Sequence, residues 1–168
     1  MKLLKNFFTI VMVISLTACS SDDSVPYELN NTNLSAGSFD LTYFNSYTTA
    51  TVDINGLEII SEFSATGETF QYTITFFEDG TYIADGQYVV NETTTVAGQI
   101  TEQDTYIVDE DNEQGTYVAN NDAMQLVIDD DVFDIILFNA NELRISLNNI
   151  YTEEGVDFLQ TGEIRMVR

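Results

Sequence analysis

The sequence contains no histidine and no tryptophan, one cysteine, one proline and only five basic residues among 168. Without histidine the chain lacks His-based catalytic triads and the commonest metal ligand in proteins. A single cysteine excludes a disulfide within the chain. The formal net charge of −23 argues against a nucleic-acid partner, because such binding depends on Lys and Arg neutralising phosphates.

The remaining residues offer little for catalysis. Beyond residue 18 there is no lysine, so serine and threonine hydroxyls lack a basic partner that could activate them. Carboxylates are plentiful, yet glycoside hydrolysis needs two of them about 5–10 Å apart across a cleft. We therefore expect a protein that is not an enzyme and needs no cofactor, with hydrolase activity as the one catalytic alternative left open.

The first 19 residues have the organisation of a bacterial export signal. Two lysines precede an apolar stretch at 7–16, which is shorter than the about 20 apolar residues that span a bilayer. The segment 16–19, Leu-Thr-Ala-Cys, resembles the lipobox of bacterial lipoproteins. This resemblance implies that residues 1–18 are a signal peptide, that cleavage falls between Ala18 and Cys19, and that a lipid on Cys19 anchors the protein to a membrane.

Residues 19–34 are expected to form a flexible tether. The segment is acidic at 20–24 and rich in Asn at 30–33, a composition that buries little apolar surface. Its Ser-Ser-Asp-Asp-Ser run resembles the tag that sends some Gram-negative lipoproteins to the outer face of the outer membrane. We therefore expect an outer-membrane anchor with the protein facing the cell surface, and a periplasm-facing anchor as the alternative.

Residues 35–168 predict a single all-β domain. Thr, Val, Ile, Tyr and Phe are frequent, and Gly, Asn or Asp interrupt them at short intervals. The clearest strand is 69–77, in which four apolar side chains alternate with polar ones. Asn55-Gly56 and Asp79-Gly80 predict tight hairpin turns. An acidic loop is expected at 109–114.

Eight to ten strands joined mostly by short connections indicate an antiparallel meander. A meander with one apolar face must close into a barrel or stack as two sheets. We favour an antiparallel up-and-down β-barrel, with a two-sheet β-sandwich as the alternative. Within its first strand, at 37–45, the alternation predicts that Phe39, Leu41 and Tyr43 share one face.

Several motifs, taken in order, resemble the lipocalin-like domain of small Gram-negative lipoproteins. The segment 37–41, Gly-Ser-Phe-Asp-Leu, resembles that family's opening Gly-x-Trp-x-Leu, with Phe39 in place of the tryptophan. The segments 75–82 and 115–117 resemble its central hairpin and a later strand, and Arg168 resembles its terminal arginine. The resemblance covers about residues 35–168. It implies an up-and-down barrel that can hold a small apolar ligand.

Eight apolar or aromatic side chains are candidates for the barrel interior: Phe39, Phe70, Tyr72, Ile74, Phe76, Tyr82, Tyr88 and Tyr117. They either line a ligand pocket or fill a core, because eight strands leave room for packed side chains or for one small ligand. The first reading makes the protein a surface lipoprotein that binds a small apolar molecule. The alternative is a non-catalytic structural or interaction module with a filled barrel and a surface protein partner.

One acidic segment deserves comparison with calcium sites. Asp109, Asp111 and Glu113 alternate, as the oxygen ligands of a calcium loop do. The segment departs from the EF-hand pattern, because Gln114 stands at the sixth position and Asn120 at the twelfth, where Gly and Glu are needed. We expect a solvated acidic turn with no metal, these three residues being the weak candidates.

Overall fold

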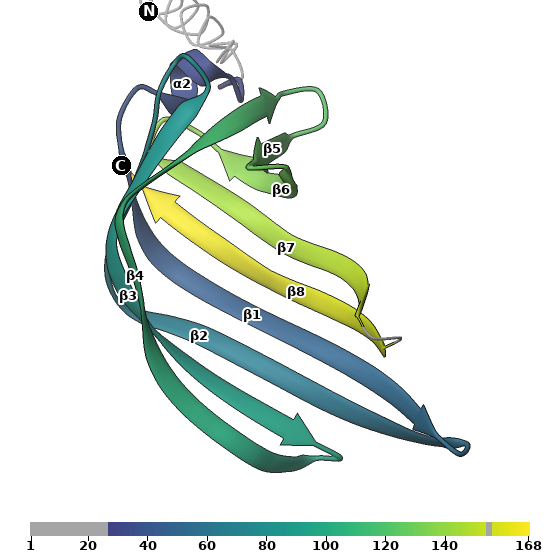
Figure 1. Ribbon diagram of the computed structural model, residues 1–168. Helices are drawn as coiled ribbons and strands as arrows, with labels where there is room; N and C mark the ends of the chain where they lie inside the picture. Colours follow the sequence, from purple (N-terminus) through teal and green to yellow (C-terminus); the bar gives the residue numbers. More distant parts are fainter. Residues whose placement is uncertain (1–26, 154–155) are drawn as a thin grey trace, which may run out of the picture.

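The computed structural model describes residues 27–153 and 156–168. Eight antiparallel strands follow one another in sequence order around a closed barrel, and the last pairs with the first (Figure 1). The predicted all-β up-and-down barrel is confirmed, and the two-sheet sandwich is excluded. The expected signal peptide, the cleavage site at Ala18 and the lipid-bearing Cys19 lie outside the described residues.

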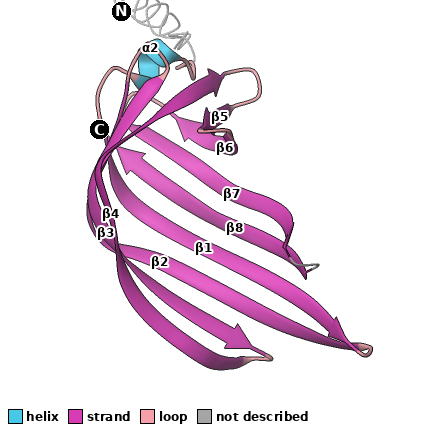
Figure 2. Ribbon diagram, in the orientation of Figure 1, coloured by secondary structure: helices cyan, strands magenta, loops and turns pink. Residues whose placement is uncertain are grey.

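The strands differ greatly in length, and within the described residues one short helix precedes them (Figure 2). In chain order the elements are α2 (Asn31–Leu34), β1 (Phe39–Ile54), β2 (Leu57–Phe76), β3 (Thr81–Val96), β4 (Gln99–Asn120), β5 (Gln125–Ile128), β6 (Asp131–Phe138), β7 (Glu142–Glu153) and β8 (Val156–Val167). Within the described ranges no helix is long and apolar enough to cross a membrane.

Tight turns join β1 to β2 and β2 to β3. The β1–β2 turn has positive φ at both Asn55 (59°) and Gly56 (83°), as a type I′ hairpin requires. At the β2–β3 turn the Asp79 carboxylate accepts hydrogen bonds from the backbone N–H (3.1 Å) and the hydroxyl (2.6 Å) of Thr81. Both predicted turns are confirmed. Their small size holds each strand beside the next and produces the meander.

The unequal strands close the barrel at one end only. Strand β5 has 4 residues, and β4, which has 22, pairs with it only over residues 117–120. Strand β6 pairs with β7 only as far as Ser146. Among the described strand pairs, residues 99–116 of β4 therefore pair only with β3, and residues 147–153 of β7 only with β8.

We call the part that contains β5, β6 and α2 the closed end, and the part formed by the long strands alone the open half (Figure 1). The gap between the unpaired edges of β4 and β7 is the seam. Two bulges lie where one part passes into the other, one in β2 between Glu68 and Gln71 and one in β4 between Glu110 and Glu113, opposite Gly86 of β3. A Cβ atom at Gly86 would overlap the carbonyl oxygen of Gln71, so only glycine permits this approach of the two backbones.

The closed end is covered by the segment that precedes β1. Leu29 and Leu34 are 1% and 0% exposed and belong to the barrel core. The side chain of Asn30 accepts a hydrogen bond from the Asn33 backbone N–H at 2.9 Å and begins helix α2. The prediction of a flexible tether is therefore wrong for residues 27–34, because two leucines among the asparagines find a buried site.

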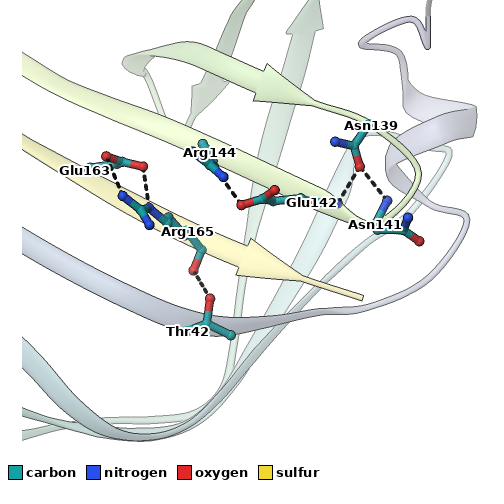
Figure 3. Close-up of polar contacts among 7 residues, drawn as sticks. All are labelled: Thr42, Asn139, Asn141, Glu142, Arg144, Glu163 and Arg165. Atoms are coloured by element: carbon teal, nitrogen blue, oxygen red, sulfur yellow. Dashed lines mark hydrogen bonds and ion pairs between the residues drawn. The ribbon is translucent and has the colours of Figure 1, made fainter.

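Two local predictions are also wrong. Residues 109–114 form part of β4 rather than a loop, since a strand edge that faces solvent tolerates a run of charges. In β1 the register shifts between Leu41 and Tyr43, which leaves Tyr43 exposed and turns Phe44 inward. The hydroxyl of Thr42, between them, donates to the backbone carbonyl of Arg165 at 3.2 Å (Figure 3).

Candidate functional site

An apolar cavity of about 190 Å³ lies inside the barrel, beyond the packed residues of the closed end. Seven of the eight strands, all but β4, contribute to its wall, because inward-facing positions recur at every second residue of a strand. Each lining side chain is aliphatic, aromatic or a methionine: Leu41, Phe44, Tyr72, Ile74, Tyr82, Tyr88, Ile128, Phe133, Ile145, Ile164 and Met166.

The eight predicted interior residues divide between this wall and its surroundings. Tyr72, Ile74, Tyr82 and Tyr88 line the cavity. The ring of Phe70 packs beside Tyr88 at the edge of the core. The other three predicted residues are buried in the core of the closed end: Phe39, Phe76 and Tyr117. The predicted interior residues therefore fill a core in one part of the barrel and line a cavity in the other.

Seven lining residues were not among the predicted ones: Leu41, Phe44, Ile128, Phe133, Ile145, Ile164 and Met166. Leu143, Ile145 and Leu147 alternate with polar residues in β7 and are all buried, so this period of two could have identified Ile145. Phe44 carried no such signal, because the bulge in β1 reverses the alternation before it. Ile128 and Phe133 lie beside the β5–β6 turn, and which side chains of this short hairpin face the cavity depends on its register with β4 and β7.

Four aromatic rings gather on one side of the cavity. The Tyr88 ring centroid lies 5.9 Å from that of Phe44, 6.0 Å from Phe70 and 5.6 Å from Tyr72. Tyr72 and Phe44 meet Tyr88 edge to face, the arrangement that aromatic quadrupoles favour. We call these four residues the aromatic cluster. Burial raises the pKa of Tyr72 to about 12, so this hydroxyl stays protonated at neutral pH.

The closed end is held by the last residue of the chain. The Arg168 guanidinium lies 4.0 Å from the centroid of the Phe39 ring, a cation–π contact. It donates hydrogen bonds to the carbonyl oxygens of Asn33 (2.5 Å), Leu34 (2.9 Å) and Ala140 (3.1 Å). One side chain thus connects the covering segment, β1 and the β6–β7 turn.

The β5–β6 turn is attached to the barrel by a carboxylate. Asp129 accepts hydrogen bonds from the Tyr82 hydroxyl at 2.5 Å and from the Thr116 backbone N–H at 2.8 Å. The backbone hydrogen bond from Thr116, and then that from Tyr82, lower the pKa of Asp129. Burial, followed by the same Asp129 contact, raises the pKa of Tyr82. Gly115 faces this carboxylate, and a Cβ atom there would overlap it.

The weak metal candidates do not come together. Asp109 pairs with Gln87 on the outer face of the barrel, whereas Glu113 pairs with Ala84, which is buried on the inner face. A bulge in β4 between Glu110 and Glu113 places Asp109 and Glu113 on opposite faces, although they are four positions apart along the strand. Among the described residues, no group of three or more His, Cys, Asp or Glu side chains could hold a metal ion. The acidic loop in which these residues were expected is not formed, since residues 109–114 belong to β4.

The outer face of β7 and β8 carries two ion pairs (Figure 3). Arg144 contacts Glu142 at 2.6 Å and Arg165 contacts Glu163 at 2.5 Å, each along its own strand. Both arginines alternate with buried residues, Leu143 and Met166 among them, so they point away from the cavity. The charges of these arginines are already compensated on the surface.

Comparison with known proteins adds little to this geometry. No family model matches the sequence, and no curated protein matches it. Among solved structures the chain is similar to Ail, the attachment invasion locus protein of Yersinia pestis. The two share 10% sequence identity over 78% of this chain and 97% of that one, with a TM-score of 0.23. Because the superposition is this poor, the barrel is assigned from its own strand pairings.

Proposed function

We propose that the protein is a lipid-anchored outer-membrane lipoprotein, facing the cell surface, whose lipocalin-like barrel binds a small apolar ligand. The observation that carries this proposal is the cavity, about 190 Å³ in volume with eleven apolar or aromatic lining residues. An apolar cavity of about 150 Å³ is enough to bind benzene. The volume is below the about 300–1,000 Å³ of drug-sized sites, so the ligand is small or extends into the open half.

The distribution of polar residues supports a tether rather than a spanning barrel. A barrel that crosses a membrane has an apolar outer surface and a polar interior. Here Ile74 and Phe76 of β2 are buried inside, and outward positions of the same strand hold Glu68, Gln71 and Thr73. Attachment through a lipid on Cys19 would place such a water-compatible barrel at a membrane surface.

One contact supports the lipocalin-like assignment. The resemblance rests on motifs at both ends of the domain, including Phe39 in the position of the family's tryptophan and the terminal Arg168. These two side chains are 129 positions apart in sequence, yet they pack together at 4.0 Å. A shared structural role at the closed end would explain why both motifs occur in one chain.

Native mass spectrometry of the lipoprotein from its own membrane tests ligand binding. We expect a co-purified small molecule that the Ile164→Phe variant, with an enlarged side chain in the cavity wall, no longer retains. Leu159→Phe is the matched control, because Leu159 lies on the same strand and is 44% exposed. A protein without any bound molecule, or one that Ile164→Phe retains as well as the control does, would contradict the proposal.

The anchor has a separate test. Mass spectrometry of the mature N-terminus should find acylated Cys19, and Cys19→Ala should release the protein from the membrane fraction. Protease treatment of intact cells should then remove the surface-exposed domain. Resistance to protease with an acylated Cys19 would favour the periplasm-facing alternative, whereas an unmodified Cys19 would refute the lipoprotein assignment.

A second candidate function has its own supporting observation. The edge of β4 over residues 99–116 has no second strand beside it among the described pairs, and Ile100 and Ile107 are 64% and 62% exposed. Such an edge can accept a strand from a partner protein, which is how an interaction module with a filled barrel would act. Cross-linking in intact cells from residue 107, with loss of the product in Ile107→Pro, would support this alternative.

A further inference from the structure

The inward face of β4 beside the cavity carries only negative charge. Glu113 pairs with Ala84, which is buried, and Glu110 pairs with Gly86, two residues further along the same face of β3. Directly paired residues of antiparallel strands lie on the same face of the sheet. Both carboxylates therefore face the barrel interior at the seam, where the cavity wall lacks a strand.

A third carboxylate lies further into the open half. Glu92 lines a second hollow of about 230 Å³ on the inner surface, together with Thr48, Phe63, Tyr151 and Phe158. It is the only charged residue of that lining. A ligand that extends from the cavity along the inner surface therefore meets apolar rings and carboxylates.

No positive charge compensates these groups from within the described barrel. Arg144 and Arg165 are paired with carboxylates on the outer face, and Arg168 is bound at the closed end. The described residues contain no other arginine and no lysine or histidine. Negative charge consequently prevails at the mouth of the cavity.

The influence of these carboxylates extends to the cavity wall. After burial, the largest cause of the raised pKa of Tyr72 is Glu110, and Glu113 contributes as well. Glu110 also raises the pKa of Tyr88, after burial and Tyr106. An anionic ligand beside these hydroxyls would experience the same repulsion. A cation there would be attracted, and the aromatic cluster offers ring faces that favour cations further.

We propose that the cavity selects apolar ligands that carry a positive charge, with the apolar body between Ile74 and Ile145 and the cation at the seam beside Glu110 and Glu113. Fatty acids and other anionic amphiphiles are excluded by the same carboxylates. This inference rests on the proposed ligand-binding function and adds the charge of the ligand to it. Opposite charges near a desolvated site give selectivity that salt weakens.

Three probes that share a phenyl ring and a four-carbon chain and differ in their polar end group test the inference: 4-phenylbutylammonium, 4-phenylbutan-1-ol and 4-phenylbutanoate. The mature lipoprotein is held in phosphatidylcholine nanodiscs, and binding is followed by ligand-observed NMR against empty nanodiscs. We expect the ammonium probe to bind at least about tenfold more tightly than the carboxylate, a difference of about 1.4 kcal/mol, with the alcohol between them. The ratio should decrease when salt is raised from 20 mM to 500 mM.

The variant Glu110→Gln/Glu113→Gln should reduce the affinity for the ammonium probe to that for the alcohol and leave the alcohol unchanged. The control Glu68→Gln/Asp109→Asn removes the same charge from exposed, outward positions and should preserve the preference. Equal or tighter binding of the carboxylate, or an ammonium preference that the control abolishes equally, would overturn the charge selectivity while leaving the cavity a binding site. Binding of none of the three probes would refute the ligand-binding function itself.

Discussion

The closed end and the open half of this barrel are built from the same strands but hold them in different ways. At the closed end every strand has two neighbours, and Leu34 and Phe39 are fully buried. In the open half β4 and β7 each lose one neighbour, and the aromatic pair Tyr151 and Phe158 stacks at a centroid distance of 5.0 Å while remaining partly exposed.

This difference places the cavity. The closed end provides a rigid base, because its side chains form one buried cluster and Arg168 connects its parts. The open half lets the cavity communicate with solvent along the seam. The packed core that stabilises the barrel and the opening of the cavity to solvent thus lie at opposite ends, as expected when a binding site is built on a rigid support.

Hydrogen exchange should give the largest contrast between the two parts. Alternate amides of residues 102–110 point away from β3 into the seam, so they should exchange almost as in an unfolded chain. Amides of residues 61–66 in β2, paired on both sides, should be protected at least about a hundredfold more. Mass spectrometry of exchanged peptides measures this. Equal protection of the two segments would mean that the seam is closed in solution.

Truncation of a buried ring should be more costly at the closed end. Phe39→Ala removes a fully buried ring that contacts Phe76 and Arg168, and should lower the free energy of unfolding by about 3–5 kcal/mol. Phe158→Ala in the open half should cost less than about half of that, because this ring is partly exposed. Urea denaturation followed by tyrosine fluorescence measures both. The reverse order would refute the division into two parts.

Arg168→Ala should have the next largest effect. The substitution leaves three carbonyl oxygens without the guanidinium and should cost about 1.5–3 kcal/mol. Arg165→Ala, its control, breaks a partly exposed ion pair on the outer face and should cost at most about 1 kcal/mol. The same denaturation measurement compares them, and a similar small loss for both would show that Arg168 does not hold the closed end together.

The smallest expected effect concerns the pH dependence of the β5–β6 turn. The pKa of Asp129 is lowered in the folded protein, so its contribution to stability is complete above about pH 4 and is lost as the pH falls through the lowered value. Asp129→Asn should therefore lose less stability than the wild type between pH 6 and pH 3. Tyr82→Phe, which removes one hydrogen bond to Asp129, should lie between them. If the denaturation midpoint changes by the same amount between pH 6 and pH 3 in all three proteins, this prediction is contradicted.

The alternation of residues predicted much of the barrel but failed wherever the backbone departs from a regular strand. Period two along β2 identified Tyr72, Ile74 and Phe76 as inward-facing side chains. The bulge at Thr42 reversed the pattern in β1, so that Phe44 rather than Tyr43 faces the cavity. The composition of 27–34 led to a wrong prediction. Burial of its two leucines in the closed end of the barrel stabilises the segment despite its three asparagines and one threonine.

The sequence by itself determined an all-β meander, its tight turns and the absence of histidine and thiol chemistry from the domain, because these depend on local periodicity and on residue inventory. Only the tertiary structure decided that the barrel is closed at one end, and that Glu110 and Glu113 lie on the inward face of a strand instead of in a loop. These features depend on which strands stop early and on the register between strands, both set by contacts between residues far apart in sequence.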